Sequence, residues 1–227
     1  MATLPVASVS HDLCVSDGQR YLYVVFSCTP YKIGRFIRVM THNRYNHVSI
    51  SLDPELKQLY SFARYYRDIP FYAGFVRESG ARYSHHDRVA NIKICALPVT
   101  EEQYRVAKQK LDTMRHTVDR YHYNLLSAIV TPLHCRIRIP NAYTCVEFVM
   151  DFLTSVGACP GLDPKGTYAI REFERIIAPY EIYRGQFPHS IRHPHDVFER
   201  HPDLITAAAL TVVANAKLLG ALIRCKL

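Results

Sequence analysis

The chain has 227 residues, a length that allows one well-buried domain with an appended segment and argues against two ordinary domains. Its 48% hydrophobic and 21% charged residues, with only 9 glycines, exclude a disordered or collagen-like chain. The formal charge of +8 favours anionic partners in general. Lys and Arg are spread along the chain without a dense run, so we expect no specific nucleic-acid site.

The seven cysteines form an odd set without a C-x-x-C pair. This pattern argues against a disulfide framework and a four-cysteine zinc site, and it favours a reducing compartment. The histidines lack the spacing of metal ligands on a helix, so we expect no metal and no other cofactor. Residues 1–17 lack the basic and apolar regions of a signal peptide, which predicts a cytoplasmic protein.

The first third of the chain predicts strands with one helix between them. Arg20 to Cys28 is nearly continuous in apolar and β-branched residues, as is typical of a central strand. A helix is expected after Thr29-Pro30, because threonine is a good N-cap and proline fits the first helical turn. Tyr45 to Asp53 predicts a second strand, and Gln58 to Arg64 is expected to return as the other arm of a hairpin.

Further along, Val89 to Leu97 predicts another strand. Thr100 to Gln103 then resembles a capping box at the start of a helix that runs to about Thr117. A third helix is expected to begin at Cys145 and to end at Gly157, with one apolar stripe facing the core. Two shorter elements come after it, a helix within Thr167–Glu174 and a strand at Tyr180–Tyr183.

Cys145 and His47 are the strongest candidates for chemistry. A cysteine at a helix N-terminus meets unpaired backbone N–H groups and the positive end of the helix dipole, which favour a thiolate. A neutral imidazole beside it can take the thiol proton, and this is how a cysteine nucleophile is made. The sequence alone does not establish that the two side chains meet, and each residue taken singly is better explained by a structural role in packing.

Five segments share a resemblance to one known family: Ser27–Arg38, Tyr45–Ile50, Leu59–Arg64, Gly74–Glu78 and Tyr143–Val149. Together they resemble the circularly permuted papain-like cysteine hydrolases of the NlpC type, which are also related to lecithin retinol acyltransferase-like proteins. In such proteins the histidine strand precedes the cysteine helix, as it does here. The resemblance covers roughly Tyr21 to Tyr183 and implies an α+β fold, with a central antiparallel sheet packed against helices.

The resemblance implies that Cys145 is the nucleophile and His47 the general base, with a third polar group from the following strand to orient the imidazole. Ser61 is the first choice for that group, because a three-residue loop would pair Leu52 with Leu56 and therefore His47 with Ser61. Arg64 or Glu78 would serve if the register differs.

Three further roles are expected around this site. Tyr45 either lines the cleft or merely packs, and together with Arg64 and Glu78 it is a candidate for substrate binding. Glu147 is expected to face away from the thiol, where it ties the helix to the sheet or caps its N-terminus. The backbone N–H of Cys145 is expected to form half of an oxyanion hole.

The C-terminal tail differs from the rest. Leu204 to Ile223 predicts a helix that is apolar nearly all round, and such a helix is buried in protein, in a partner or in lipid. We therefore expect it to dock on the domain, to form an oligomer contact or to associate with a membrane. The expected organisation is a lead-in at 1–19, a catalytic domain at 20–187, and a His/Pro-rich linker with the apolar helix at 188–227.

The function that these observations favour is a thiol hydrolase that cleaves an amide or ester bond through an acyl-enzyme on Cys145. The expected substrate is a peptide or a lipid with such a bond. The alternatives are a lipid acyltransferase or phospholipase-like enzyme, and a catalytically inactive binding module of the same fold.

Overall fold

The computed structural model describes residues 19–31, 34–35, 38, 43–85, 88–133, 135–159, 161–163, 166–188 and 197–226. The expected lead-in before residue 19 and most of the expected linker at 189–196 lie outside these residues. Most of the helix expected after Thr29-Pro30 also lies outside them, although Gly34, Arg35 and Arg38 are helical.

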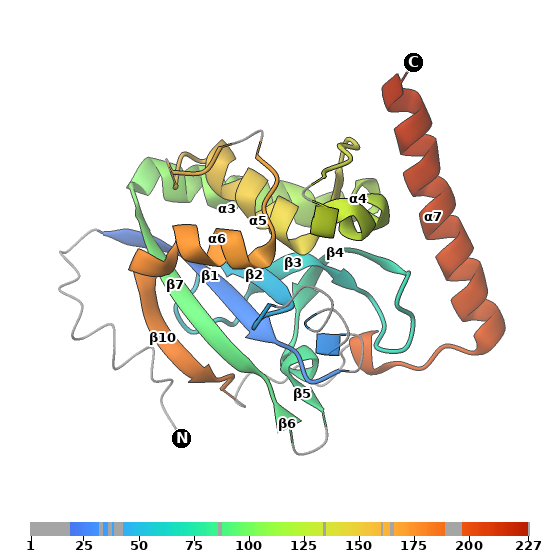
Figure 1. The fold of residues 1–227 in the computed structure, drawn as a ribbon, viewed down its shortest axis with the longest axis horizontal. Coiled ribbons are helices and arrows are strands. Elements are labelled where there is room, and N and C mark those ends of the chain that lie inside the picture. The colour runs from blue at the N-terminus through green and yellow to red at the C-terminus, as the bar shows by residue number, and fades with distance from the viewer. Residues whose placement is uncertain are drawn as a thin grey trace.

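Six strands form one antiparallel sheet in the order β10-β7-β1-β2-β3-β4 (Figure 1). Their bounds are β1 Arg20–Cys28, β2 His47–Ser51, β3 Leu59–Arg64, β4 Ala73–Glu78, β7 Asn91–Val99 and β10 Glu181–Gln186. The central position predicted for β1 is confirmed, since it pairs with β7 on one side and β2 on the other. Its nearly continuous apolar sequence reflects burial on both faces of the sheet.

Helices cover one face of this sheet (Figure 1). They are α3 Glu101–His116, α4 Leu125–Val130, α5 Cys145–Ser155 and α6 Ile170–Ile176, and a long helix, α7 Leu204–Lys226, lies at the C-terminus. The smaller elements are strands β5 Ser84–His85, β6 Arg88–Val89, β8 His122–Tyr123 and β9 Ala142–Tyr143, and 3₁₀ turns η1 Gly80–Tyr83, η2 Val118–Arg120, η3 Thr131–Leu133, η4 Ala178–Tyr180 and η5 Val197–Glu199. The chain is therefore α+β with a large antiparallel sheet.

Alternate residues of the strands enter two different cores. Residues such as Phe26, Ile50 and Phe62 pack under α5, against its Phe148 and Phe152. The opposite face holds a smaller cluster that includes Val25, Leu59, Tyr83, Ile92 and Phe187. Because side chains alternate along a strand, His47 and Ser49 share this second face, opposite to Val48 and Ile50.

The hairpin between β2 and β3 differs from the expected one. The predicted pairing of Leu52 with Leu56 is wrong, because Ser51 pairs with Leu59 and the strands are joined by the longer connection 52–58. The side chain of Asp53 organises that connection, accepting hydrogen bonds from the backbone N–H groups of Glu55 and Lys57, both at 2.9 Å. Continuing the observed register places His47 opposite Ala63, two residues away from Ser61.

The apolar tail is helical over Leu204–Lys226, as predicted. Asp203 caps it, since its carboxylate accepts hydrogen bonds from the backbone N–H and the hydroxyl of Thr206. Leu218 is buried in a small cluster with Ile139 and Ala142. Six other large apolar side chains of the helix remain exposed, at Leu204, Ile205, Val212, Val213, Leu219 and Ile223. Docking on the domain therefore covers only part of the apolar surface.

Candidate active site

Helix α5 begins at Cys145 because the residues around it form a capping box. The hydroxyl of Thr144, the N-cap, accepts the N–H of Glu147 at 3.2 Å, and the Glu147 carboxylate accepts the N–H of Thr144 at 2.7 Å. Cys145 thus occupies the first helical position, where its own N–H has no acceptor within the helix. Its side chain is buried, with 8% of the residue exposed.

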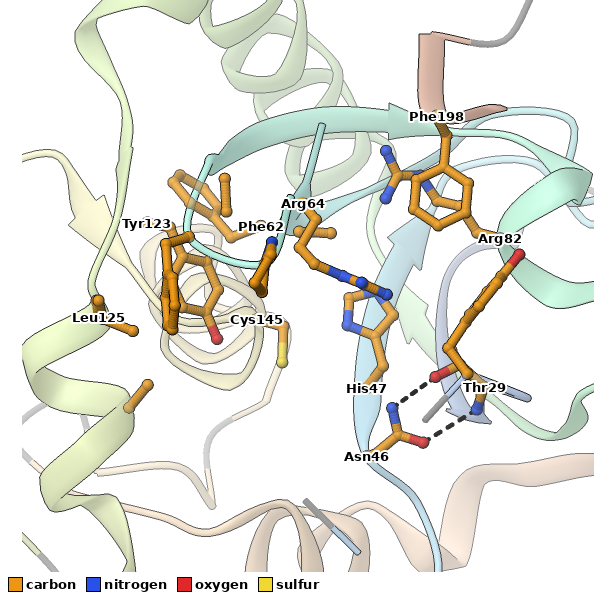
Figure 2. A pocket seen from close by; sticks show the side chains of 16 residues that line it. Thr29, Asn46, His47, Phe62, Arg64, Arg82, Tyr123, Leu125, Cys145 and Phe198 are labelled. Atoms are coloured by element: carbon orange, nitrogen blue, oxygen red, sulfur yellow. Dashed lines mark hydrogen bonds between the residues drawn. The ribbon is translucent and has the colours of Figure 1, made fainter. Parts of the chain in front are cut away.

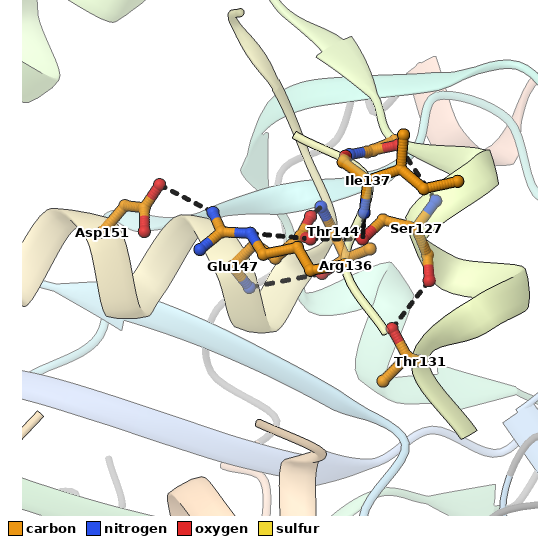
Figure 3. Close-up of polar contacts among 8 residues, drawn as sticks. Ser127, Thr131, Arg136, Ile137, Thr144, Glu147 and Asp151 are labelled. Carbon is orange, nitrogen blue, oxygen red and sulfur yellow. Dashed lines mark hydrogen bonds and ion pairs between the residues drawn. The ribbon is translucent and has the colours of Figure 1, made fainter. Parts of the chain in front are cut away.

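Glu147 also connects the start of α5 to the neighbouring segments (Figure 3). Its carboxylate accepts a hydrogen bond from Ser127 of α4 and forms an ion pair with Arg136 at 3.1 Å. Arg136 in turn pairs with Asp151, one turn further along α5, at 2.9 Å. The capping role expected for Glu147 is confirmed, and the residue ties the helix to α4 and to the segment before β9. The expected tie to the sheet is not among these contacts.

We expect Glu147→Gln to lower the free energy of unfolding by about 1–3 kcal/mol, because it removes one of the two carboxylates that pair with the largely buried Arg136 guanidinium and leaves only Asp151. Urea denaturation followed by circular dichroism measures this change. Glu102→Gln, at an exposed ion pair on α3, is the matched control and is expected to leave the stability nearly unchanged. Equal effects of the two substitutions would show that the Glu147 network does not stabilise the fold.

His47 is the first residue of β2, and a buried carboxylate holds its imidazole. Nε2 of His47 donates to Oε1 of Glu78 at 2.5 Å, and Glu78 lies on β4 with only 2% of the residue exposed. This bond engages one ring nitrogen and leaves Nδ1 for another partner. The upstream neighbour Asn46 fixes the approach to the strand, with its side chain hydrogen-bonded to the backbone N–H and the hydroxyl of Thr29 (Figure 2).

Glu78 is surrounded by donors on the second face of the sheet. Besides His47, its Oε1 accepts a hydrogen bond from the hydroxyl of Ser61. Its Oε2 accepts one from Ser49 at 2.9 Å and another from the phenol of Tyr83. Four donors therefore satisfy both oxygens, which is the condition for keeping a carboxylate ionised away from water.

This environment shifts the pKa values of the pair in opposite directions. Burial by itself lowers the pKa of His47, but the charge of Glu78 and hydrogen bonding to Cys145 and Glu78 outweigh it and raise this pKa to about 10. Burial raises the pKa of Glu78, yet the charge and hydrogen bond of His47, together with Arg82 and Ser61, lower it to about 2. At neutral pH the two groups therefore form an imidazolium–carboxylate ion pair.

His47 and Cys145 line the same pocket, a cavity of about 210 Å³ (Figure 2). Its lining includes the apolar side chains of Phe62 and Leu125, the phenol of Tyr123, and the charged side chains of Arg64 and Arg82. The interaction between Cys145 and His47 contributes to the raised pKa of the imidazole. The structure thus brings the predicted nucleophile and base together, although the two residues are almost a hundred positions apart in the sequence.

The remaining predicted site residues take different places around the pocket. Arg64 lines it, as expected for a residue that contacts substrate. Ser61 contacts Glu78 and not His47, and the residue bonded to the imidazole is Glu78, one of the two alternatives to Ser61. Glu78 lies behind the imidazole and is not among the residues that line the pocket. Tyr45 is 1% exposed, packs against Phe26 and also lies outside the lining, which favours its packing role.

Sequence reasoning missed Ser49, Tyr83 and Arg82. The signal for Ser49 was available, because polar residues at alternate positions after His47 predict a polar strip on one face of the strand. Tyr83 and Arg82 lie in the short turn η1, which has too few residues to show any periodicity. Only the packing of that turn over the second face brings them to Glu78 and to the pocket.

Within the described ranges, no three side chains of His, Cys, Asp or Glu come together in a way that could hold a metal ion. Comparisons of the chain with family models, with curated proteins and with solved structures found no match. Any functional assignment therefore depends on the geometry of the pocket around Cys145 and His47.

Proposed function

We propose that this chain is a thiol hydrolase that cleaves an amide or ester bond through an acyl-enzyme on Cys145. The observation that carries the proposal is the series of contacts at one pocket: Cys145 at the N-terminus of α5, His47 beside it, and the buried Glu78 on the far nitrogen of His47. A nucleophile, a base and a group that orients the base are the three parts that such catalysis requires.

These positions define the chemistry. An imidazolium beside a thiol stabilises the thiolate, and the thiolate attacks the carbonyl carbon of the substrate. The backbone N–H of Cys145 points out of the first helical turn and can donate to the oxyanion that forms. His47 then gives its proton to the leaving amine or alcohol, and a thioester remains on Cys145. Water, deprotonated by His47, cleaves this thioester and releases the acid.

A permuted papain-like fold of the NlpC type agrees with this proposal. In support, the histidine strand β2 precedes the cysteine helix α5 in the chain, and α5 packs on the face of the antiparallel sheet formed by β2 and β3. The motif segments that carry the resemblance contribute His47, Arg64, Glu78 and Cys145, which meet at or directly behind the pocket.

The rate of alkylation by iodoacetamide at neutral pH tests the activated thiol. Cys145 is expected to react at least about tenfold faster than Cys135, an exposed thiol in the same chain, and far faster than Cys95. Burial raises the pKa of Cys95 to about 12, so its reactive thiolate is scarce at neutral pH. Peptide mapping by mass spectrometry measures the three rates in one sample.

The outcome separates the hydrolase from the alternative of an inactive binding module. If Cys145 reacts no faster than Cys95, the thiol is not activated and the pocket is a binding site only. If Cys145 reacts fast, p-nitrophenyl esters and p-nitroanilides with different acyl chains are tested as substrates. Release of the nitrophenolate or nitroaniline shows which bond is cleaved, and intact-mass measurement detects the thioester on Cys145.

A lipid substrate is the second candidate, and α7 favours it. Leu204–Arg224 is long and apolar enough to cross a membrane, and a stretch of 18 residues within it has a mean hydropathy of 1.6 with only 6% of that stretch buried. Its polar residues Thr211 and Asn215 hydrogen-bond to carbonyl oxygens of the same helix, which lowers the cost of contact with lipid. Asn215 also contacts the backbone of Phe71, an exposed residue of the pocket lining, so the helix lies near the active site.

We therefore expect the chain to bind membranes through α7. The full chain should co-sediment with vesicles of phosphatidylcholine and phosphatidylglycerol, and a chain truncated before Asp203 should not. Val212→Lys combined with Val213→Lys keeps the buried contact of Leu218 and adds positive charge. Loss of binding in this variant indicates insertion of the apolar face, because purely electrostatic attraction would strengthen.

Two results would contradict membrane binding. One is unchanged co-sedimentation of the truncated chain. The other is a full chain that does not co-sediment with vesicles and that forms a dimer in solution, with the truncated chain monomeric by light scattering. The second result would assign the exposed apolar face to another copy of the chain.

A further inference from the structure

The pocket around Cys145 carries more positive charge than the proposed chemistry uses. Arg64 enters its lining from β3 and Arg82 from the turn η1, next to the His47 imidazolium. None of the described residues that line the pocket is Asp or Glu. Behind the pocket, the buried carboxylate of Glu78 pairs with His47, and the charge of Arg82 also acts on it.

The two arginines are held in place by an aromatic residue. The guanidinium carbon of Arg82 lies 4.3 Å from the ring centre of Phe198, and that of Arg64 lies 5.8 Å from the same ring. Arg64 also donates a hydrogen bond to the backbone oxygen of Arg67 at 2.6 Å. Cation–π contacts of this kind restrict the motion of both guanidinium groups.

Their charges act on one another. Burial lowers the pKa of Arg64, and the charge of Arg82 lowers it further. Asp68 acts in the opposite direction on Arg64, but its carboxylate is engaged by His201 at 2.5 Å and by Arg67 at 3.5 Å. Two like charges held together in a half-buried pocket are unfavourable by themselves, and an anion between them removes the repulsion.

The two sides of the pocket differ in chemical character. In Figure 2, the ring of Tyr123 and the apolar side chain of Leu125 lie on one side of Cys145, and His47 and Arg82 lie on the other side. A substrate whose scissile carbonyl sits at Cys145 would therefore place an apolar group toward α4 and a charged group toward the arginines.

We infer that Arg64 and Arg82 form an anion subsite, and that the substrate carries a carboxylate or phosphate group beside its scissile bond. This inference rests on the proposed function, because a scissile bond exists only if the chain is a hydrolase. The anion subsite itself can be tested without any turnover. Guanidinium groups bind both carboxylate and phosphate through paired N–H donors, so the two anions share one recognition chemistry.

The test compares two alkylating agents of nearly equal size, the anion iodoacetate and the neutral iodoacetamide. In both reactions the thiolate sulfur forms a bond to the CH₂ carbon and iodide leaves. The preference for iodoacetate at Cys145 is expected to exceed that at the exposed Cys135 by about tenfold in the same sample. Arg64→Gln and Arg82→Gln should each reduce this preference about threefold or more, and Arg64→Lys should retain most of it.

Arg77→Gln is the matched control, because Arg77 is exposed on β4, does not line the pocket and loses the same charge. It should leave the preference unchanged. Far-UV circular dichroism confirms folding, and if Arg82→Gln does not fold, Arg64→Gln carries the test. Protection of the wild-type Cys145 from iodoacetamide by inorganic phosphate or by acetate then tells which anion fits the subsite.

Equal preferences at Cys145 and Cys135, or an undiminished preference in folded Arg64→Gln, would overturn the anion subsite. A different result would contradict the proposed hydrolase. In that case the iodoacetamide rate at Cys145 is no faster than at Cys95, while the ratio between the two reagents still measures the effect of the arginines.

Discussion

Cys145→Ala is expected to reduce turnover by about 10⁴-fold or more, to the uncatalysed background, because it removes the atom that forms the acyl-enzyme. The substitution deletes one sulfur and little volume at a position that is 8% exposed, so we expect the free energy of unfolding to change by less than about 1 kcal/mol. The release of p-nitrophenolate from the most rapidly cleaved p-nitrophenyl ester measures the rate, and intact mass measures the thioester.

Cys135→Ala provides the control for the loss of a thiol elsewhere in the chain and should be fully active. His47→Ala is expected to cost about as much as Cys145→Ala, since the members of one nucleophile–base unit do not act additively. Turnover and thioester formation that persist in Cys145→Ala would rule out the acyl-enzyme mechanism.

Glu78→Gln is expected to reduce turnover by about 10²- to 10⁴-fold, because a neutral amide cannot hold the His47 imidazolium as the carboxylate does. Ser61→Ala should cost much less, since Glu78 keeps its bonds from His47, Ser49 and Tyr83. If Ser61→Ala were as severe as Glu78→Gln, Ser61 would have a role beyond holding this carboxylate. Glu102→Gln controls for the loss of a negative charge at an exposed site.

The same pair makes stability depend on pH. The pKa of His47 is raised to about 10. Its contribution to the free energy of unfolding is therefore complete below its ordinary pKa of 6.5 and is lost as the pH rises through about 10. The pKa of Glu78 is lowered to about 2, so its contribution is complete above its ordinary pKa of 4.5 and is lost as the pH falls through about 2.

The stability lost in Glu78→Gln should therefore be largest between about pH 4.5 and 6.5 and should shrink toward pH 10. Urea denaturation of wild type and variant near pH 5.5 and near pH 9.5 measures the two differences. A difference that is the same at both pH values would show that His47 and Glu78 are not an ion pair in the folded protein.

The elements of this fold were predictable where the signal is local. β1 was predicted with its observed bounds, because an apolar, β-branched run is typical of a strand covered on both faces. The start of α3 was predicted from its capping box, since such a box is made by residues three positions apart. The start of α5 at Cys145 was predicted from its apolar stripe, and the structure adds a capping box there. The predicted end of α5 at Gly157 is also local, because glycine readily adopts the left-handed conformation, here with a φ of 68°, that turns the chain after a helix.

The candidate site was predictable only in part. Cys145 and His47 were found because each lies in a short motif with its own local structure. The partner of His47 was not determined, because it depends on the register of β2 and β3, and that register is set by how Asp53 binds the backbone of its loop. A shift of two residues along the strand leaves the hydrophobic pattern unchanged, so the pattern cannot reveal it.

The sequence by itself thus determined the α+β class, the apolar tail and the two residues proposed for the chemistry. The tertiary structure decided that Glu78 holds the imidazole, that Tyr45 packs in the core and that Arg82 joins Arg64 at the pocket. The physical reason is the range of the interactions concerned. Capping and periodicity act within one or two turns, whereas a buried carboxylate finds its partners across three strands and a turn that only the folded chain brings together.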